Sequence, residues 1–226
     1  MATKRTISLQ KKLKPRKAEN VLFIGAHPDD IELGCWGALR YHLKKGDNIY
    51  AMVFSRGEQG ADLAKEDRYG VSKKAYTAFG IKKENISLID IPDTRFPDYK
   101  ERIFKAIEKT CVEASITKVF THTNKEYHQD HITLHEETLR AARNVQNIIS
   151  YESNAHTFPT FSPNYFIDIT KYIDSKVSII TKHISQSEKK YCEAENIKSL
   201  AKFRGYQSRT AKYSEGFEII RMAVSE

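Results

Sequence analysis

The chain has 226 residues, of which 40% are hydrophobic and 29% are charged, a composition that fits one globular domain and excludes an intrinsically disordered chain. No window approaches the roughly 18 uninterrupted apolar residues of a membrane helix, and the first residues lack the apolar stretch of a secretion signal. We therefore expect a soluble, cytoplasmic protein with no membrane span. The three cysteines Cys35, Cys111 and Cys192 lie far apart, which argues against a disulfide framework or a four-cysteine zinc site.

The net charge of +8 is concentrated at the start of the chain. Residues 1–19 carry seven lysines and arginines against the single acid Glu19, so most of the excess charge belongs to this segment. We interpret residues 1–19 as a basic, flexible N-terminal arm and residues 20–226 as a single domain. Non-specific binding of nucleic acid by the arm is the alternative, and we do not expect a nucleic-acid partner because the remaining body is nearly neutral.

Short apolar, β-branched runs alternate with longer segments of helical spacing from residue 21 onward, which predicts βαβ units and a parallel sheet. The predicted strands are Val21–Ala26, Asn48–Phe54, Ile86–Ile89, Lys118–Thr121 and Asn147–Tyr151. After Pro163 we predict an extended run at 164–169, helices at about 172–184 and 188–204, and a final apolar run at 217–223. Ligands of such sheets bind where the strands end, so the loops after strands are the place to look for a site.

The loop after the first predicted strand reads Gly25-Ala26-His27-Pro28-Asp29-Asp30. His27 and Asp30 are three residues apart across a turn, so an imidazole nitrogen and a carboxylate oxygen can converge on one metal ion. Asp29 remains free and is well placed to take a proton from a metal-bound water. The alternative is that Asp29 and Asp30 only cap the helix that follows.

A histidine-rich cluster follows the fourth predicted strand and comprises His122, the run Tyr127-His128-Gln129-Asp130-His131, and His135. His131 begins a helical segment at the same edge of the sheet as His27, so it is a candidate third ligand. Two histidines and one carboxylate are a usual catalytic zinc set that leaves a position for water. His128 as an imidazolium would stabilise an oxyanion and then protonate the leaving amine, and Asp130 would orient one of the imidazoles. His135 is either a further ligand or a solvent-facing or packed histidine.

The two motifs together, GAHPDD after the first strand and HQDH after the fourth, resemble the LmbE-like or PIG-L superfamily of zinc-dependent N-acetylglucosaminide de-N-acetylases. The resemblance runs from about residue 20 to the end and implies a three-layer α/β/α sandwich with a Rossmann-like, mostly parallel sheet. The run Arg56-Gly57-Glu58-Gln59-Gly60 is similar to the family's Gly-Glu-x-Gly segment, and Asp93 falls where a substrate-contacting aspartate is usual. One departure is the run Arg68-Tyr69-Gly70-Val71, where the family often has a glutamate three residues after the arginine.

The resemblance implies that Zn²⁺, or alternatively Fe²⁺, is held by His27, Asp30 and His131. It also implies that Asp29 is the general base and that His128 stabilises the oxyanion. The implied reaction removes an acetyl group from an N-acetylglucosamine-type sugar conjugate and releases acetate and a free amine. Members of the family often form trimers or hexamers, so a homo-oligomer is expected.

The implied substrate contacts are Arg56 and Arg68, whose guanidinium groups suit a carboxylate or phosphate, and Asp93, which suits sugar hydroxyls. A metal-dependent hydrolase acting on a non-sugar N-acyl compound is the main alternative. A nucleotide-binding module ranks lower, because no Gly-x-Gly-x-x-Gly or Gly-Lys-Ser/Thr loop follows any predicted strand.

Overall fold

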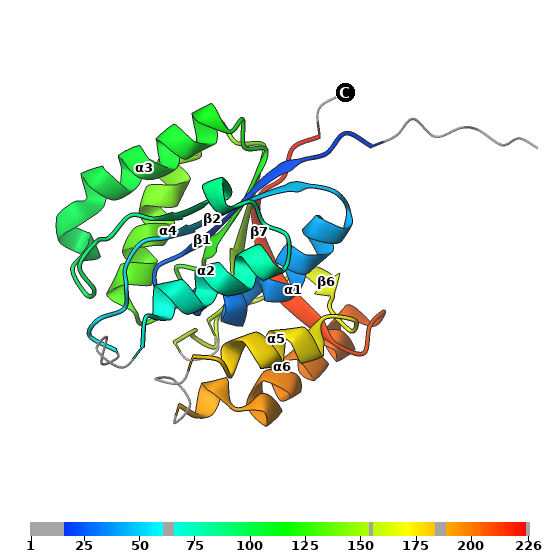
Figure 1. The fold of residues 1–226 in the computed structure, drawn as a ribbon. Helices are drawn as coiled ribbons and strands as arrows, with labels where there is room; N and C mark the ends of the chain where they lie inside the picture. The colour runs from blue at the N-terminus through cyan, green and yellow to red at the C-terminus, as the bar shows by residue number, and fades with distance from the viewer. Residues whose placement is uncertain (1–15, 61–65, 154–155, 184–188, 225–226) are drawn as a thin grey trace, which may run out of the picture.

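The computed structural model describes residues 16–60, 66–153, 156–183 and 189–224, and its sheet has the strand order β3-β2-β1-β4-β5-β7-β6 (Figure 1). Strand β7 is antiparallel to its neighbours β5 and β6, whereas the pairs from β3 through β5 are parallel. The strands are β1 (Asn20–Gly25), β2 (Asn48–Val53), β3 (Ile86–Leu88), β4 (Lys118–His122), β5 (Asn147–Tyr151), β6 (Tyr165–Asp168) and β7 (Ser214–Arg221).

Helices cover both faces of this sheet (Figure 1). Helices α3 and α4 lie together on one face, and α1, α2, α5 and α6 lie on the other. The α-helices are α1 (Asp30–Lys44), α2 (Arg68–Ala78), α3 (Lys100–Glu113), α4 (Gln129–Ala141), α5 (Ile173–Ile180) and α6 (Ala194–Ser208). Short 3₁₀ segments are η1 (Lys83–Asn85), η2 (Phe96–Tyr99) and η4 (Lys190–Cys192).

The central strand β1 explains why the chain adopts three layers. Its alternate side chains enter two separate cores: Val21 and Phe23 pack toward α1, whereas Leu22 and Ile24 pack toward α3 and α4. All four side chains are fully buried. A strand that is apolar on both faces needs helices on both sides, as parallel sheets generally do. The predicted α/β/α sandwich with a mostly parallel sheet is therefore confirmed.

The predicted elements in the last third of the chain differ from the observed ones at their ends. Helix α5 ends at Ile180, and α6 runs from Ala194 to Ser208 because η4 precedes it and Arg209 takes a left-handed conformation after it. Strand β7 begins at Ser214, because its first residues pair with β6. The predicted helix ends at 184 and 188 lie outside the described residues.

The buried carboxylate of Glu215 stabilises the interior of helix α1. The backbone departs from helical angles at Cys35, which frees amide groups in the next turn. Glu215 on β7 accepts hydrogen bonds from the amides of Gly37 and Ala38, at 2.9 and 2.8 Å, and from Lys176 at 2.7 Å. A buried donor without an acceptor costs about 1–3 kcal/mol, so this one side chain compensates for the irregular helix.

Of the predicted basic arm, residues 1–15 lie outside the described part of the chain. Arg16, at its end, forms an ion pair with Asp47, which also accepts the amide of Glu19 at 2.8 Å. The division into an arm and a single domain stays a prediction. None of the described helices combines the length and the apolar composition that crossing a bilayer requires.

The strand order places one edge of the sheet in position for a site. The chain leaves β1 toward β2 on one side and later returns to add β4 on the other side of β1. The loops after β1 and β4 therefore diverge at this point and leave a crevice between them. The two predicted site motifs occupy these two loops.

Candidate active site

The loop between β1 and α1 directs two aspartates in different directions. The backbone amide of His27 donates to Asp30 Oδ2 at 2.7 Å, which turns the Asp30 carboxylate back into the loop. Asp29 occupies the N-cap position with φ of 105°, a left-handed conformation, yet its side chain makes no capping hydrogen bond. The capping alternative therefore does not explain where either carboxylate lies.

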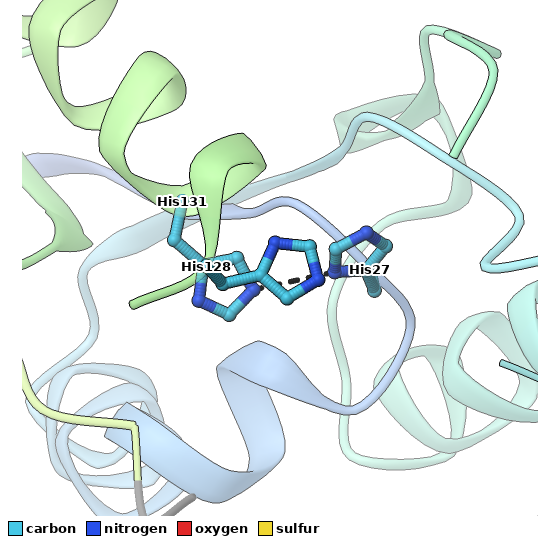
Figure 2. Close-up of side chains that lie close together, drawn as sticks. All are labelled: His27, His128 and His131. Carbon is cyan, nitrogen blue, oxygen red and sulfur yellow. Dashed lines mark hydrogen bonds between the residues drawn. The ribbon is translucent and has the colours of Figure 1, made fainter. Parts of the chain in front are cut away.

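The start of helix α4 presents His128 and His131 to the same cavity. His128 is the N-cap residue, and its Nδ1 accepts the backbone amide of Asp130 at 3.3 Å. His131 lies in the first turn, and its ring stacks against that of His128 with a centroid distance of 4.6 Å. Figure 2 shows the rings of His27 and His131 meeting at the crevice, with His128 beside them.

Three donor atoms converge between these loops. His27 Nδ1 lies 3.3 Å from His131 Nε2, His131 Nε2 lies 3.4 Å from Asp30 Oδ2, and Asp30 Oδ2 lies 3.5 Å from His27 Nδ1. All three residues are buried. The atoms form a nearly equilateral triangle of two imidazole nitrogens and one carboxylate oxygen.

This triangle fits a tetrahedral metal ion. Ligand atoms that bind Zn²⁺ at about 2.0–2.2 Å in tetrahedral geometry lie about 3.3–3.6 Å from one another. The observed separations of 3.3, 3.4 and 3.5 Å agree with that spacing. Nitrogen and carboxylate oxygen donors suit Zn²⁺ and also Fe²⁺. The three residues could therefore hold such an ion with one coordination position left open.

The charges within the triangle stabilise one another. Burial by itself would raise the pKa of Asp30, but the imidazoles of His131 and His122 hold it well below its usual range. Burial opposes the charged form of His131, but Asp30 and Glu126 outweigh it and raise its pKa to about 9. The site thus stabilises cationic charge next to the Asp30 carboxylate, which is the electrostatic environment that a divalent cation requires.

Two buried residues that the sequence analysis did not assign complete this cluster. The Glu126 carboxylate lies in ion-pair contact with Nδ1 of His131. The Nε2 atom of His122 lies 3.2 Å from Asp30 Oδ2, and its ring stacks on His131 with centroids 3.8 Å apart. His122 belonged to the recognised histidine cluster. An acid two residues before His128 was the only signal for Glu126.

Asp29 lines the cavity beside the triangle and pairs with Arg68. Arg68 Nη2 donates to Asp29 Oδ2 at 3.0 Å and to the carbonyl of Pro28 at 2.8 Å, and its Nη1 donates to the carbonyl of Gly57 at 3.1 Å. Burial raises the pKa of Asp29, although the positive charge of Arg68 opposes this shift. Arg68, expected to contact substrate, is thus buried against the expected base.

Asp93 and Asp130 lie on the far side of the His27 ring. Asp93 Oδ1 is 2.9 Å and Asp130 Oδ2 is 3.4 Å from His27 Nε2. Asp130 also accepts the backbone amides of Thr94 and Phe96. Both carboxylates face the nitrogen that points away from the triangle, so both are in position to orient His27 with Nδ1 toward the other donors.

Arg56 and His135 lie elsewhere. The Arg56 guanidinium is about half exposed and pairs with Asp90 at 2.8 Å, and it does not line the cavity. His135 is buried, and its Nδ1 bonds the carbonyl of His122 at 2.7 Å. His135 thus follows the packed alternative rather than the ligand alternative.

The cavity above the triangle has a volume of about 230 Å³. Its walls also include Gln59, from the recognised Gly-Glu-x-Gly segment, and residues with no predicted role from loops remote in sequence: Thr94, Ser153, His156, Lys189 and Tyr191. Pairing between the loops brings some of them in, because Tyr127 donates its amide to the carbonyl of His156 at 3.0 Å. These residues line the opening with polar side chains and with two aromatic rings, those of His156 and Tyr191.

Comparison with known proteins identifies the family to which this chain belongs. Residues 22–142, which hold both motifs, match the family model of PIG-L, described as GlcNAc-PI de-N-acetylase. The chain is also 32% identical over 175 residues to the uncharacterized deacetylase YaiS of Escherichia coli (strain K12), a match that covers 75% of this chain and 92% of that protein.

Solved structures share the fold at lower identity. The N,N'-diacetylchitobiose deacetylase from Pyrococcus horikoshii matches with a TM-score of 0.74 and 22% identity, over 90% of this chain and 84% of that one. The zinc-inhibited form of teicoplanin deacetylase Orf2 matches with a TM-score of 0.71 and 15% identity, over 91% and 100% of the two chains. The extent of the family match and the identity to YaiS show that the chain belongs to the PIG-L, or LmbE-like, family of deacetylases.

Proposed function

We propose that the protein is a metal-dependent hydrolase that removes the acetyl group from an N-acetylglucosamine-type sugar conjugate, releasing acetate and a free amine. The observation that carries this proposal is the triangle of His27 Nδ1, Asp30 Oδ2 and His131 Nε2, with the carboxylate of Asp29 beside it in one cavity. The description of the matching family model and the diacetylchitobiose substrate of one similar structure support the sugar.

The triangle would hold Zn²⁺, with Fe²⁺ as the alternative. A divalent cation there supplies Lewis-acid chemistry, because it lowers the pKa of water and polarises the amide carbonyl. The zinc-inhibited form of the similar teicoplanin deacetylase indicates that a protein of this fold binds zinc, although zinc inhibits that enzyme. The protein's part is to hold the three donors at fixed separations, and the buried acids around His27 and His131 support that geometry.

Asp29 acts as the general base in this proposal. It takes a proton from the attacking water as the water oxygen bonds to the acetamide carbon, and it then gives that proton to the nitrogen as the carbon–nitrogen bond breaks. Its bond to Arg68 fixes one carboxylate oxygen and leaves the other available. Arg68 thus positions the base, a role that differs from the substrate contact implied by the resemblance.

His128 stabilises the oxyanion as a neutral donor in our proposal. Burial and the neighbouring charges of His131 and His27 lower the pKa of His128 to about 4, so the imidazolium expected from the sequence is not its resting form. Since Nδ1 accepts the amide of Asp130, the ring proton lies on Nε2. That N–H can donate to the carbonyl oxygen as negative charge develops on it.

Replacing His128 by alanine is therefore expected to lower kcat by about 10²–10³-fold while metal content stays unchanged. His128→Asn is the matched variant, because asparagine can accept the Asp130 amide and preserve the helix start. We expect His128→Asn to lose a similar share of kcat with less loss of thermal stability. Loss of the metal from either variant would show that His128 is a ligand.

The size of the cavity and the Asp93 carboxylate in its wall suggest how substrate is bound. The volume of about 230 Å³ is smaller than the roughly 300–1,000 Å³ of most ligand pockets, so it suits the acetamide end of a substrate whose remainder lies outside. Asp93 lines this cavity and remains our proposed acceptor for a sugar hydroxyl, since a carboxylate accepts about four hydrogen bonds. We do not propose Arg56 as a substrate contact, because it lies outside the cavity.

A substrate panel tests the proposal. Amine release is measured with the zinc-loaded protein on N-acetylglucosamine, N,N'-diacetylchitobiose, N-acetylglucosaminyl glycosides, and N-acetyl amino acids of similar size. We expect kcat/KM for at least one sugar conjugate to exceed that of every N-acetyl amino acid by about tenfold or more, because a site built around hydroxyl contacts rejects analogues that lack them. Preference for the amino acids would favour the alternative, a hydrolase of non-sugar N-acyl compounds.

A further inference from the structure

The buried carboxylate of Glu126 lies behind His131, on the side of the ring away from the triangle. Glu126 is about 1% exposed, and its Oε1 is in ion-pair contact with His131 Nδ1. Neither oxygen of this carboxylate, nor Nδ1 of His131, forms a hydrogen bond of ordinary geometry with any described residue, so the two groups meet as an ion pair. A buried charge is costly unless it is paired, so the contact with His131 is what allows the charged Glu126 side chain to be buried.

The backbone around Glu126 is held independently of His131. Glu126 forms an antiparallel bridge with Thr157. The amide of Tyr127 donates to the carbonyl of His156 at 3.0 Å, and the amide of Phe158 donates to the carbonyl of Lys125 at 2.7 Å. These backbone hydrogen bonds fix the loop, so the Glu126 carboxylate is held against His131. A residue that orients a ligand needs such a fixed position of its own.

The contact determines which nitrogen of His131 carries the proton. In the neutral form that a metal ligand must take, the imidazole has one N–H and one lone pair, and a carboxylate can only accept, so the proton lies on Nδ1 toward Glu126. The lone pair is then on Nε2, the atom that lies 3.3 Å from His27 Nδ1 and 3.4 Å from Asp30 Oδ2. The plane of the ring is held separately, by stacking on His122.

We propose that Glu126 is a positioning residue of the metal site: it fixes the tautomer of His131 and raises the basicity of its Nε2. This inference rests on the proposed metal-dependent function and adds a residue that holds no metal itself. Partners of this kind typically change metal affinity by about 10–100-fold. Asp93 and Asp130 provide the equivalent contacts to His27, so each ligand histidine has its own acid.

The test compares Glu126→Gln with the matched control Glu137→Gln. Glu137 is an equally buried glutamate, on helix α4, that pairs with Arg140 instead of a histidine. Zinc affinity of each metal-free protein is measured at one pH by competition with a chromophoric chelator. We expect the affinity of Glu126→Gln to fall by about 10–100-fold and that of Glu137→Gln to stay within about threefold of wild type. An unchanged affinity in Glu126→Gln would overturn the proposal.

A second measurement needs no variant and covers the case in which Glu126→Gln does not fold. Long-range nitrogen-15 NMR of the metal-free wild type, at a pH where His131 is neutral, reports which ring nitrogen of His131 bears hydrogen. We expect a protonated Nδ1, and a protonated Nε2 would contradict the assignment. If wild type binds no zinc at all, the proposed function fails with this inference. If wild type binds zinc and releases amine but Glu126→Gln binds equally well, only the role of Glu126 is wrong.

Discussion

Asp29→Asn is expected to lower kcat for amine release by about 10²–10⁴-fold and to leave the bound metal in place. The amide cannot take a proton from the attacking water, and general base catalysis contributes rate factors of that size. The metal should stay because Asp29 is not one of the three donors of the triangle. Asparagine is the suitable replacement, since residue 29 has φ of 105° and asparagine tolerates the left-handed region better than alanine.

Steady-state kinetics and elemental analysis of the same preparation check this expectation. Asp98→Asn serves as the control, because Asp98 is a half-exposed carboxylate that pairs with Arg95 at the surface. Asp98→Asn should keep wild-type kcat. If Asp29→Asn retained more than about a tenth of wild-type activity, the base assignment would be wrong. Loss of the metal would instead make Asp29 a ligand.

His131→Ala is expected to remove both metal and activity. Its Nε2 is one corner of the triangle, and a tetrahedral site with two remaining protein donors holds zinc far more weakly. We expect metal content to fall from about one ion per chain to near zero after dialysis, with activity at background.

The matched control for His131→Ala is His42→Ala. His42 is also a buried imidazole next to a carboxylate, with Nδ1 2.7 Å from Asp47, but it lies outside the cavity. Its replacement should cost stability, seen as a lower Tm, and leave about one metal per chain. Metal retained at full stoichiometry in His131→Ala would disprove the ligand assignment even if activity were lost.

The fold was predictable from sequence where burial alone determines it. Strand β5 was predicted with its observed ends, Asn147–Tyr151, and every residue of this short run of isoleucines and their neighbours is buried. The ends of α5 and α6 were not, because they depend on a 3₁₀ segment at 190–192 and on the left-handed Arg209. Such local conformations arise from packing that periodicity does not report.

Convergence of the site was predictable for a topological reason. Parallel strands end at the same edge, so motifs after β1 and β4 had to meet once those strands were neighbours. The position of Glu126 was not predictable, because it depends on a bridge to Thr157, thirty-one residues further along the chain. Likewise, only the structure reveals that Arg68 donates a hydrogen bond to Asp29 while Arg56 pairs with Asp90.

We propose that His27, Asp30 and His131 hold the one divalent cation on which amide hydrolysis depends. The most direct measurement is a titration of metal-free wild-type protein with Zn²⁺, recording amine release from N,N'-diacetylchitobiose or the best substrate of the panel. We expect background activity without metal, a linear rise, and a break at about one equivalent per chain. Full activity in protein that elemental analysis shows to be metal-free would contradict it.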